Sequence, residues 1–147
     1  SDRLCEMDRF GRKTGRGFYI YEDGKSAPDP QVDEIIVAER AAKKIDARSI
    51  PDQEIVDRYM AAMVNEAARV VEEGIALRPL DVDAVFLNGY GYPRWRGGPM
   101  HYADTVGLEK ILNDIKAFAA EDDFLWKPAP LLQRLATKGE TFASLNP

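Results

Sequence analysis

The chain has 147 residues, of which 45% are hydrophobic and 31% are charged, so it is long enough for one globular domain with a buried core. Its net charge of −5 disfavours binding to nucleic acid or to an anionic membrane surface through a global positive field. No run approaches the ~18 apolar residues that a membrane span needs. The one cysteine, Cys5, excludes an internal disulfide and fits a reducing compartment.

The first ten residues have the pattern of a helix in its last turns. Leu4, Met7 and Phe10 follow a helical spacing that stops at Gly11. This pattern is typical of the interior of a domain, and the chain opens at Ser1 without an initiator methionine. We therefore expect the sequence to be a piece of a longer polypeptide.

A basic segment with three glycines, at 11–17, leads into an aromatic stretch at 18–21. One interpretation of the basic segment is a phosphate cradle, but a Walker loop follows a strand and precedes a helix, and here that order is reversed. We therefore predict a structural turn. The aromatic stretch is the one convincing strand-like segment, and it ends at the turn signal Glu22-Asp23-Gly24. Without a partner strand, it is expected to pack on helices as a short extended arm.

Two helices follow the arm after a linker at 26–28. The first is predicted from about 30 to 45, with Asp29 as its N-cap and Pro30 in its first helical position. The second is predicted from 49 to 73 and is the longest in the chain.

The sequence predicts both ends of this long helix and one apolar face. Ser49 and Asp52 have the spacing of a capping box, and Gly74 is a stop signal. Asn65 lies beside the apolar face and is interpreted as a flanking polar group rather than a catalytic one. The residues predicted to form the buried face recur at intervals of three and four: Val56, Met60, Met63, Ala67, Val70 and Val71.

Candidate groups for acid–base chemistry lie in the next two short helices. Asp81 and Asp83 stand in a first helical turn, where carboxylates complement the helix dipole, so capping is favoured over acid–base work or cation binding. His101 is the only histidine, and Asp104 three residues later could orient it. A structural role is favoured for His101 too, because no nucleophile motif accompanies it.

The rest of the chain predicts two more amphipathic helices, at 108–119 and 131–138, with an apolar plug at 124–126 between them. Phe142 and Leu145 in the tail are expected to dock on the body of the domain. Together these patterns predict an all-α fold of about five or six packed helices with one short extended aromatic arm.

The segment from Asn88 to Met100 combines glycines, prolines, aromatic residues and two arginines. Glycine permits positive φ, proline fixes φ, and the aromatic side chains supply rigid apolar surface with polar tips, so the loop is built to hold a defined shape. We predict that it is a packing or interaction loop. The residues proposed to carry this role are Tyr90, Tyr92, Arg94, Trp95 and Arg96.

Motifs for a self-sufficient active site are missing. No Gly-x-Gly-x-x-Gly follows a strand, so a dinucleotide-binding fold is not predicted. No cluster has metal-ligand spacing, and no nucleophile elbow is present. We predict no catalytic, cofactor-binding or metal-binding residue in this chain.

Two sets of residues resemble a known family. The run Lys13-Thr14-Gly15-Arg16-Gly17-Phe18-Tyr19-Ile20-Tyr21 resembles the sequence that closes the C-terminal helical domain of 3-hydroxyacyl-CoA dehydrogenases. The segments 65–74, 81–83 and 88–99, the last with its Arg-Trp-Arg-Gly-Gly-Pro loop, resemble the second copy of that domain. A second copy is typical of multifunctional β-oxidation enzymes, which join enoyl-CoA hydratase/isomerase to the dehydrogenase.

The resemblance implies that residues 1–28 are the tail of a first helical copy with a linker, and that residues 29–147 are the second copy. In the family, hydride transfer uses a His/Glu pair and a Rossmann domain that binds NAD, and both would lie upstream. The first copy also contributes an active-site Asn, and aligning the long helices places Asp57 at that position. Asp57 therefore marks a degenerate active-site position, and the second copy is expected to keep a packing role only.

The resemblance also implies partners for the parent enzyme: an acyl-CoA substrate, the upstream dehydrogenase domains, and a homodimer or a thiolase subunit. The chain itself is expected to bind no cofactor and no nucleic acid. Three roles stay open for the Arg94-Trp95-Arg96 loop: packing within the chain, docking of another domain or subunit, and contact with a CoA phosphate. The last residues lack Ser-Lys-Leu, which favours a bacterial cytoplasm, with a peroxisome or mitochondrion as alternatives.

Overall fold

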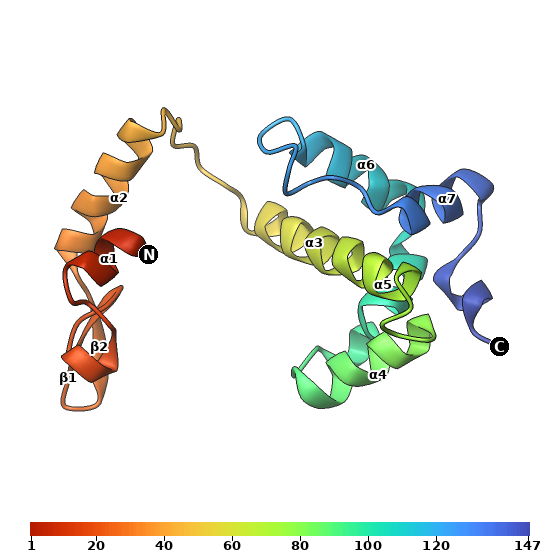
Figure 1. Ribbon diagram of the computed structural model, residues 1–147, viewed down its shortest axis with the longest axis horizontal. Helices are drawn as coiled ribbons and strands as arrows, with labels where there is room; N and C mark the ends of the chain where they lie inside the picture. Colours follow the sequence, from red (N-terminus) through yellow and green to blue (C-terminus); the bar gives the residue numbers. More distant parts are fainter. The chain divides into compact units, whose positions relative to one another are not determined.

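A computed structural model describes all residues, Ser1–Pro147. The chain divides into two compact units, Ser1–Ser49 and Ile50–Pro147, and each is described by itself (Figure 1). This division differs from the expected limit between family copies at 28/29, which stays a prediction. The structure is mostly helical with one small sheet, so the predicted all-α class is confirmed.

The first unit contains a short helix, a 3₁₀ turn, a β-hairpin and a longer helix. In chain order these are α1 (Asp2–Glu6), η1 (Arg12–Thr14), β1 (Tyr19–Glu22), β2 (Lys25–Pro28) and α2 (Pro30–Ala42). The predicted cap of α2 is confirmed, because the Asp29 side chain accepts a hydrogen bond from the Gln31 N–H and Pro30 is the first helical residue.

The prediction of an unpaired aromatic arm is wrong. β1 pairs with β2 in an antiparallel hairpin, with Tyr19 opposite Pro28 and Glu22 opposite Lys25. The residues expected to be a linker therefore form the second strand. The reason lies in the Asp23-Gly24 turn, where both residues have positive φ, at 49° and 77°, as a two-residue hairpin loop requires.

A buried ion pair organises the first unit. Arg9 is buried, and its guanidinium donates to Asp29 at 2.5 Å, to the Gln31 side chain at 2.6 Å and to the Gly17 carbonyl at 3.0 and 3.2 Å. Arg9 thus joins the glycine-rich turn to the start of α2. The predicted structural turn over 11–17 is confirmed, because η1 forms there and the Phe10 N–H donates to the Thr14 hydroxyl at 2.9 Å.

The second unit is a helical bundle built around one long helix. Its elements are α3 (Asp52–Glu72), α4 (Pro79–Gly89), η2 (Arg94–Arg96), α5 (Pro99–Val106), α6 (Leu108–Phe118), α7 (Pro130–Lys138) and η3 (Phe142–Leu145). Figure 1 shows α6 and α7 along one side of α3, with α4 across from them. None of the helices combines the length and the apolar character needed to cross a lipid bilayer.

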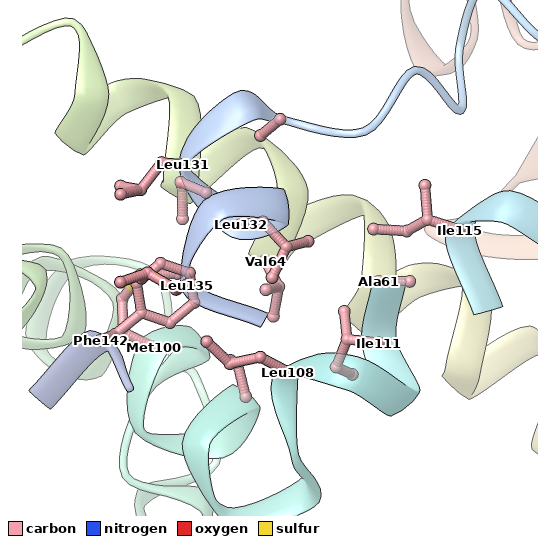
Figure 2. Close-up of a cluster of buried hydrophobic side chains, with 14 of the residues drawn as sticks. Ala61, Val64, Met100, Leu108, Ile111, Ile115, Leu131, Leu132, Leu135 and Phe142 are labelled. Atoms are coloured by element: carbon pink, nitrogen blue, oxygen red, sulfur yellow. The ribbon is translucent and has the colours of Figure 1, made fainter. Parts of the chain in front are cut away.

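The core of this unit lies between α3, α5, α6 and α7 (Figure 2). Leucines and isoleucines from α6 and α7 meet Ala61 and Val64 of α3, and Phe142 of η3 is fully buried beside Met100. These contacts confirm the predicted apolar faces of the last two helices and the docking of Phe142. Burying side chains of this size contributes about 1.5–3 kcal/mol each, as an upper estimate.

Several details of the bundle differ from the predictions. α3 begins at Asp52 after Pro51, so Ser49 does not cap it. Met60 and Ala67 of the predicted stripe on α3 are buried, which confirms part of it. The rest of the buried face is shifted to Ala61, Val64, Asn65 and Ala68, because α5, α6 and α7 pack there.

The predicted apolar plug at 124–126 is only partly present. Trp126 is buried, but Phe124 is 91% exposed and Leu125 is also exposed. The tail likewise docks through Phe142 alone, since Leu145 remains exposed. In both segments one aromatic residue fills the available space, and its apolar neighbours face solvent.

The Arg9–Asp29 pair makes the first unit sensitive to acid. The hydrogen bond from Arg9 holds the pKa of Asp29 below its ordinary value of 3.8. A lowered folded-state pKa contributes stability above about pH 4 that is lost as the pH falls through that folded pKa. We expect the amide-exchange protection factors of Gly17 and Tyr21, which are hydrogen-bonded in the turn and hairpin, to fall below pH 4, after correction for the intrinsic exchange rate at each pH. An Asp29→Asn variant should lack this step; an identical acid step in the variant would contradict the assignment.

Candidate interaction site

An apolar groove runs between α3 and α4 in the second unit. Its volume is about 780 Å³, within the range of ligand or docking clefts. Two acidic side chains, Glu66 and Asp81, lie among apolar and aromatic ones. The complete lining is Tyr59, Ala62, Met63, Glu66, Ala67, Val70, Ile75, Ala76, Leu77, Asp81, Val82, Val85, Phe86 and Tyr90.

Large apolar side chains on the rim of this α3–α4 groove are exposed. Leu77 is 87% exposed and Ile75 is 72% exposed, and Tyr59 and Val85 also face solvent. A contiguous exposed apolar surface of this kind is typical of a site where another protein surface packs. The groove lies on the Met63 side of α3, the side that the sequence suggested for helix packing and that α5–α7 leave uncovered.

The predicted interaction loop forms a corner at one end of the groove. Pro93 precedes the short turn η2, and Gly97 ends it with φ +75°. Tyr92 is buried, and its hydroxyl lies 3.7 Å from the Met60 sulfur. Burial raises the pKa of Tyr92 to about 12, so the phenol stays neutral.

The five residues predicted for this loop therefore do two different things. Tyr92 anchors the corner, whereas Trp95 is 79% exposed and Tyr90 is 75% exposed. The Arg96 guanidinium stacks on the Trp95 ring at 4.3 Å and lies 5.2 Å from the Tyr102 ring centre. Arg94 is exposed. The prediction that these residues act as a packing or interaction set is untested by the geometry.

A second cavity, of about 440 Å³, lies against the corner. It shares Tyr59, Met63, Phe86 and Tyr90 with the groove. Its remaining walls come from α3 and the loop: Val56, Met60, Gly91, Tyr92, Pro93, Trp95 and Arg96.

A buried carboxylate fixes the corner to the following helix. Both oxygens of Asp83 in α4 accept backbone N–H groups at the start of α5, from Met100 at 2.7 Å and from His101 at 3.0 Å. Burial raises the pKa of Asp83, and the two N–H groups oppose that shift. The predicted capping role is thus correct in kind, but the capped helix is α5 and not α4. Asp81 instead pairs with Arg78 at 2.6 Å.

The predicted His101–Asp104 contact does not form. Asp104 accepts the N–H groups of Phe142 and Ala143 at 2.8 Å each, and so holds the start of η3. His101 is exposed. Its favoured structural role is consistent with this arrangement, since no carboxylate orients the ring.

Asn65 is the polar residue whose burial the sequence analysis missed. Its side chain donates to the Lys127 carbonyl at 2.9 Å and accepts from the Ala129 N–H at 2.7 Å, and Arg69 donates to the same Lys127 carbonyl. These bonds hold the extended segment before α7 against α3. The sequence held no local signal for this burial, because the groups that bind Asn65 lie more than sixty residues away.

Asp57 lies on the outer part of α3, where it accepts a hydrogen bond from the Gln53 side chain at 2.8 Å. Nothing in this environment tests its assignment as a degenerate active-site position. No three His, Cys, Asp or Glu side chains converge to hold a metal ion. The corner and groove present exposed apolar side chains and two arginines.

The fold and this surface define a class: a small all-α domain whose buried polar side chains cap helices and whose apolar groove is exposed. Residues 55–143 match the family described as the C-terminal domain of 3-hydroxyacyl-CoA dehydrogenase. The chain belongs to this family, as the resemblance implied.

Relatives with known names extend over nearly the whole chain. A peroxisomal bifunctional enzyme of Danio rerio is 42% identical over 143 residues, 94% of this chain. The peroxisomal bifunctional enzyme of Homo sapiens is 39% identical over the same share. A fatty acid oxidation complex subunit alpha of Shewanella amazonensis is 37% identical over 96% of this chain. The chain spans about 20% of the length of each of these relatives.

The contact between Asp83 and Gly98 gives a test of the corner. Gly98 has φ +103°, and a Cβ there would press into the Asp83 carboxylate. We expect Gly98→Ala to lower the free energy of unfolding by about 2 kcal/mol or more, because it combines backbone strain with a displaced cap. Gly89→Ala is the control, since a Cβ at Gly89 meets nothing within 4 Å. Urea denaturation measures both; equal effects would contradict the assignment.

Proposed function

We propose that the chain is the C-terminal part of a multifunctional fatty-acid oxidation enzyme that oxidises 3-hydroxyacyl-CoA to 3-oxoacyl-CoA with NAD. Membership of the dehydrogenase family supports this proposal, as do the names of the relatives, which include multifunctional fatty-acid oxidation proteins of animals, a plant and bacteria. Residues 1–28 would end a first helical copy, and residues 29–147 would form a second copy.

The exposed α3–α4 groove is the observation that supports a packing role for this chain. In the longer enzyme, helices of the preceding copy would cover the groove, as a dimer partner would in a simpler dehydrogenase. Its exposed leucine, isoleucine, valine and tyrosine side chains favour a protein occupant, because burying them removes apolar surface from water. The groove therefore supports a packing role better than a catalytic one.

The catalytic groups and the NAD site would then lie in the preceding part of the enzyme. Within this chain His101 is exposed without an orienting carboxylate, and the buried Asp83 and Asn65 are engaged with backbone groups. Asp57 would mark the position at which the first copy has its active-site Asn. The enzyme would work in a bacterial cytoplasm, with a peroxisome or a mitochondrion as alternatives; the names of the animal and plant relatives support the peroxisome, and the bacterial relatives fit the cytoplasm.

A second candidate role is docking of another domain, a second copy or a thiolase subunit through the Arg94-Trp95-Arg96 loop. The exposure of Trp95 favours it, since Trp and Arg are enriched among residues that dominate interface energies. Assembly of the longer enzyme in an Arg94→Ala/Arg96→Ala variant separates the two roles: loss of assembly would support docking, and normal assembly would remove it.

The chain by itself is expected to lack dehydrogenase activity. We predict no acetoacetyl-CoA-dependent oxidation of NADH above the blank, measured by absorbance at high protein concentration, because the hydride-transfer groups are proposed to lie upstream. The complete enzyme prepared in parallel is the positive control. Measurable turnover that scales with the concentration of the chain would overturn the proposal that the catalytic groups lie upstream.

The groove is tested by charge substitution in the complete enzyme. Val85 is exposed in the groove, and Leu125 is similarly exposed outside it. A Val85→Arg variant should place an unpaired charge in the packed interface and so lower the melting temperature of the enzyme by several degrees. A loss of about 1 kcal/mol in the free energy of unfolding corresponds to about 2–4 °C for a domain of this order of size. Leu125→Arg should leave the melting temperature unchanged. Equal behaviour of the two variants would exclude the groove as an internal interface.

A further inference from the structure

Two arginines at the corner stand apart from the others in the second unit. Residues 50–147 contain six arginines. Four of them pair with carboxylates: Arg58 with Glu54 and Glu121, Arg69 with Glu66, Arg78 with Asp81, and Arg134 with Glu72. Arg94 and Arg96 have no carboxylate partner, although the chain as a whole is acidic.

The environment of Arg96 leaves its N–H groups free for a ligand. Its guanidinium is held against the rings of Trp95 and Tyr102, and stacking uses the face of the guanidinium rather than its N–H edge. The group is therefore placed and oriented before any anion arrives. Arg94, two residues earlier in the same 3₁₀ turn, adds a second positive charge. A planar donor of this type matches a phosphate or carboxylate in a bidentate way.

Beside these charges lies an aromatic cavity. Tyr92 and Trp95 are the aromatic residues of its wall that the α3–α4 groove does not share, and its volume of about 440 Å³ suits a small organic molecule or part of one. Trp95 is mostly exposed, so its ring is available as a stacking surface. The corner thus offers two complementary features, a stacking surface for a planar ring and positive charge for an anion.

We propose that this corner binds the phosphorylated nucleotide portion of coenzyme A, with the purine ring on the aromatic surface and the phosphates near Arg94 and Arg96. The proposal rests on the proposed function only for the choice of coenzyme A among purine nucleotides. Such a site would hold the polar end of an acyl-CoA thioester away from the reacting atoms. It would raise the local concentration of substrate at the surface of the enzyme.

A small ligand accounts for the corner better than an acidic polypeptide does. The unpaired charges number two and lie within one turn of three residues, whereas an extended acidic segment would need a longer basic track. The rest of the groove carries Glu66 and Asp81, which repel a continuing acidic chain. The positive charge is thus confined to the end of the cavity.

The test is equilibrium binding to the 147-residue chain. Adenosine 3′,5′-bisphosphate and coenzyme A are titrated while tryptophan emission is followed, because Trp95 is exposed and Trp126 is buried. We expect saturable quenching of the long-wavelength emission, lost in Trp95→Phe, and binding that weakens as salt rises. Arg94→Ala/Arg96→Ala should weaken binding by about tenfold or more, which corresponds to about 1.4 kcal/mol.

Arg134→Ala is the control for a general charge effect, since it removes one positive charge, half of what the double variant loses, from an exposed site on α7. It should bind both ligands as the unchanged chain does. Inorganic phosphate and adenosine should each bind much more weakly than the bisphosphate, because each offers only half of the recognised chemistry.

Absence of saturable binding, or equal weakening by Arg134→Ala and the double variant, would overturn the site. Binding of inorganic phosphate as tight as that of the bisphosphate would overturn the role of the aromatic surface. Equal affinity for ADP and coenzyme A would overturn the choice of coenzyme A. Because these measurements use the chain alone, they can fail while the dehydrogenase proposal stands, which is tested separately by activity of the complete enzyme.

Discussion

The geometry of the candidate site depends on one buried carboxylate. The Asp83 side chain projects from α4 and caps the N-terminus of α5. Gly98 has no Cβ, so the two helices can approach closely enough for this contact. The loop between them must therefore turn within a fixed span, which is why it uses prolines and glycines with positive φ. Tyr92 fills the inside of that turn, and Trp95 is left outside. The bond that caps α5 therefore also determines the shape of the loop between α4 and α5.

The same use of polar side chains recurs through the second unit. Asp104 closes η3, Asn65 holds the backbone before α7, and Glu72 accepts the Leu131 N–H at the start of α7. Each of these side chains joins its own element to one that is distant in the sequence. It does so by accepting a backbone N–H that has no partner within the distant element. Hence the carboxylates of Asp81, Asp83 and Asp104 are already engaged, whereas His101 is exposed without an orienting carboxylate. The apolar groove and the arginine corner are the surfaces of the second unit for which we propose roles.

The sequence predicts the helices well because their apolar spacing, stop glycines and first-turn prolines are local signals. It fails where the deciding partner is distant. The second hairpin strand, Lys25–Pro28, has no strand pattern of its own and exists because β1 pairs with it. The burial of Asn65 depends on a segment more than sixty residues away. The loop residues Tyr90 to Arg96 were identifiable by composition, but only packing separates the anchor Tyr92 from the exposed Trp95.

The Arg9–Asp29 pair has a consequence for how the first unit is specified. Leu4 and Val32 are its only buried hydrophobic side chains, so little apolar burial drives this unit to fold. A buried ion pair is costly to break, because the remaining charge is left without its partner, and it tolerates few alternative arrangements of the groups around it. The first unit is therefore defined more by directional bonds than by a core. Its geometry depends on bonds of defined direction, and little buried apolar surface is present to retain that geometry once those bonds are broken.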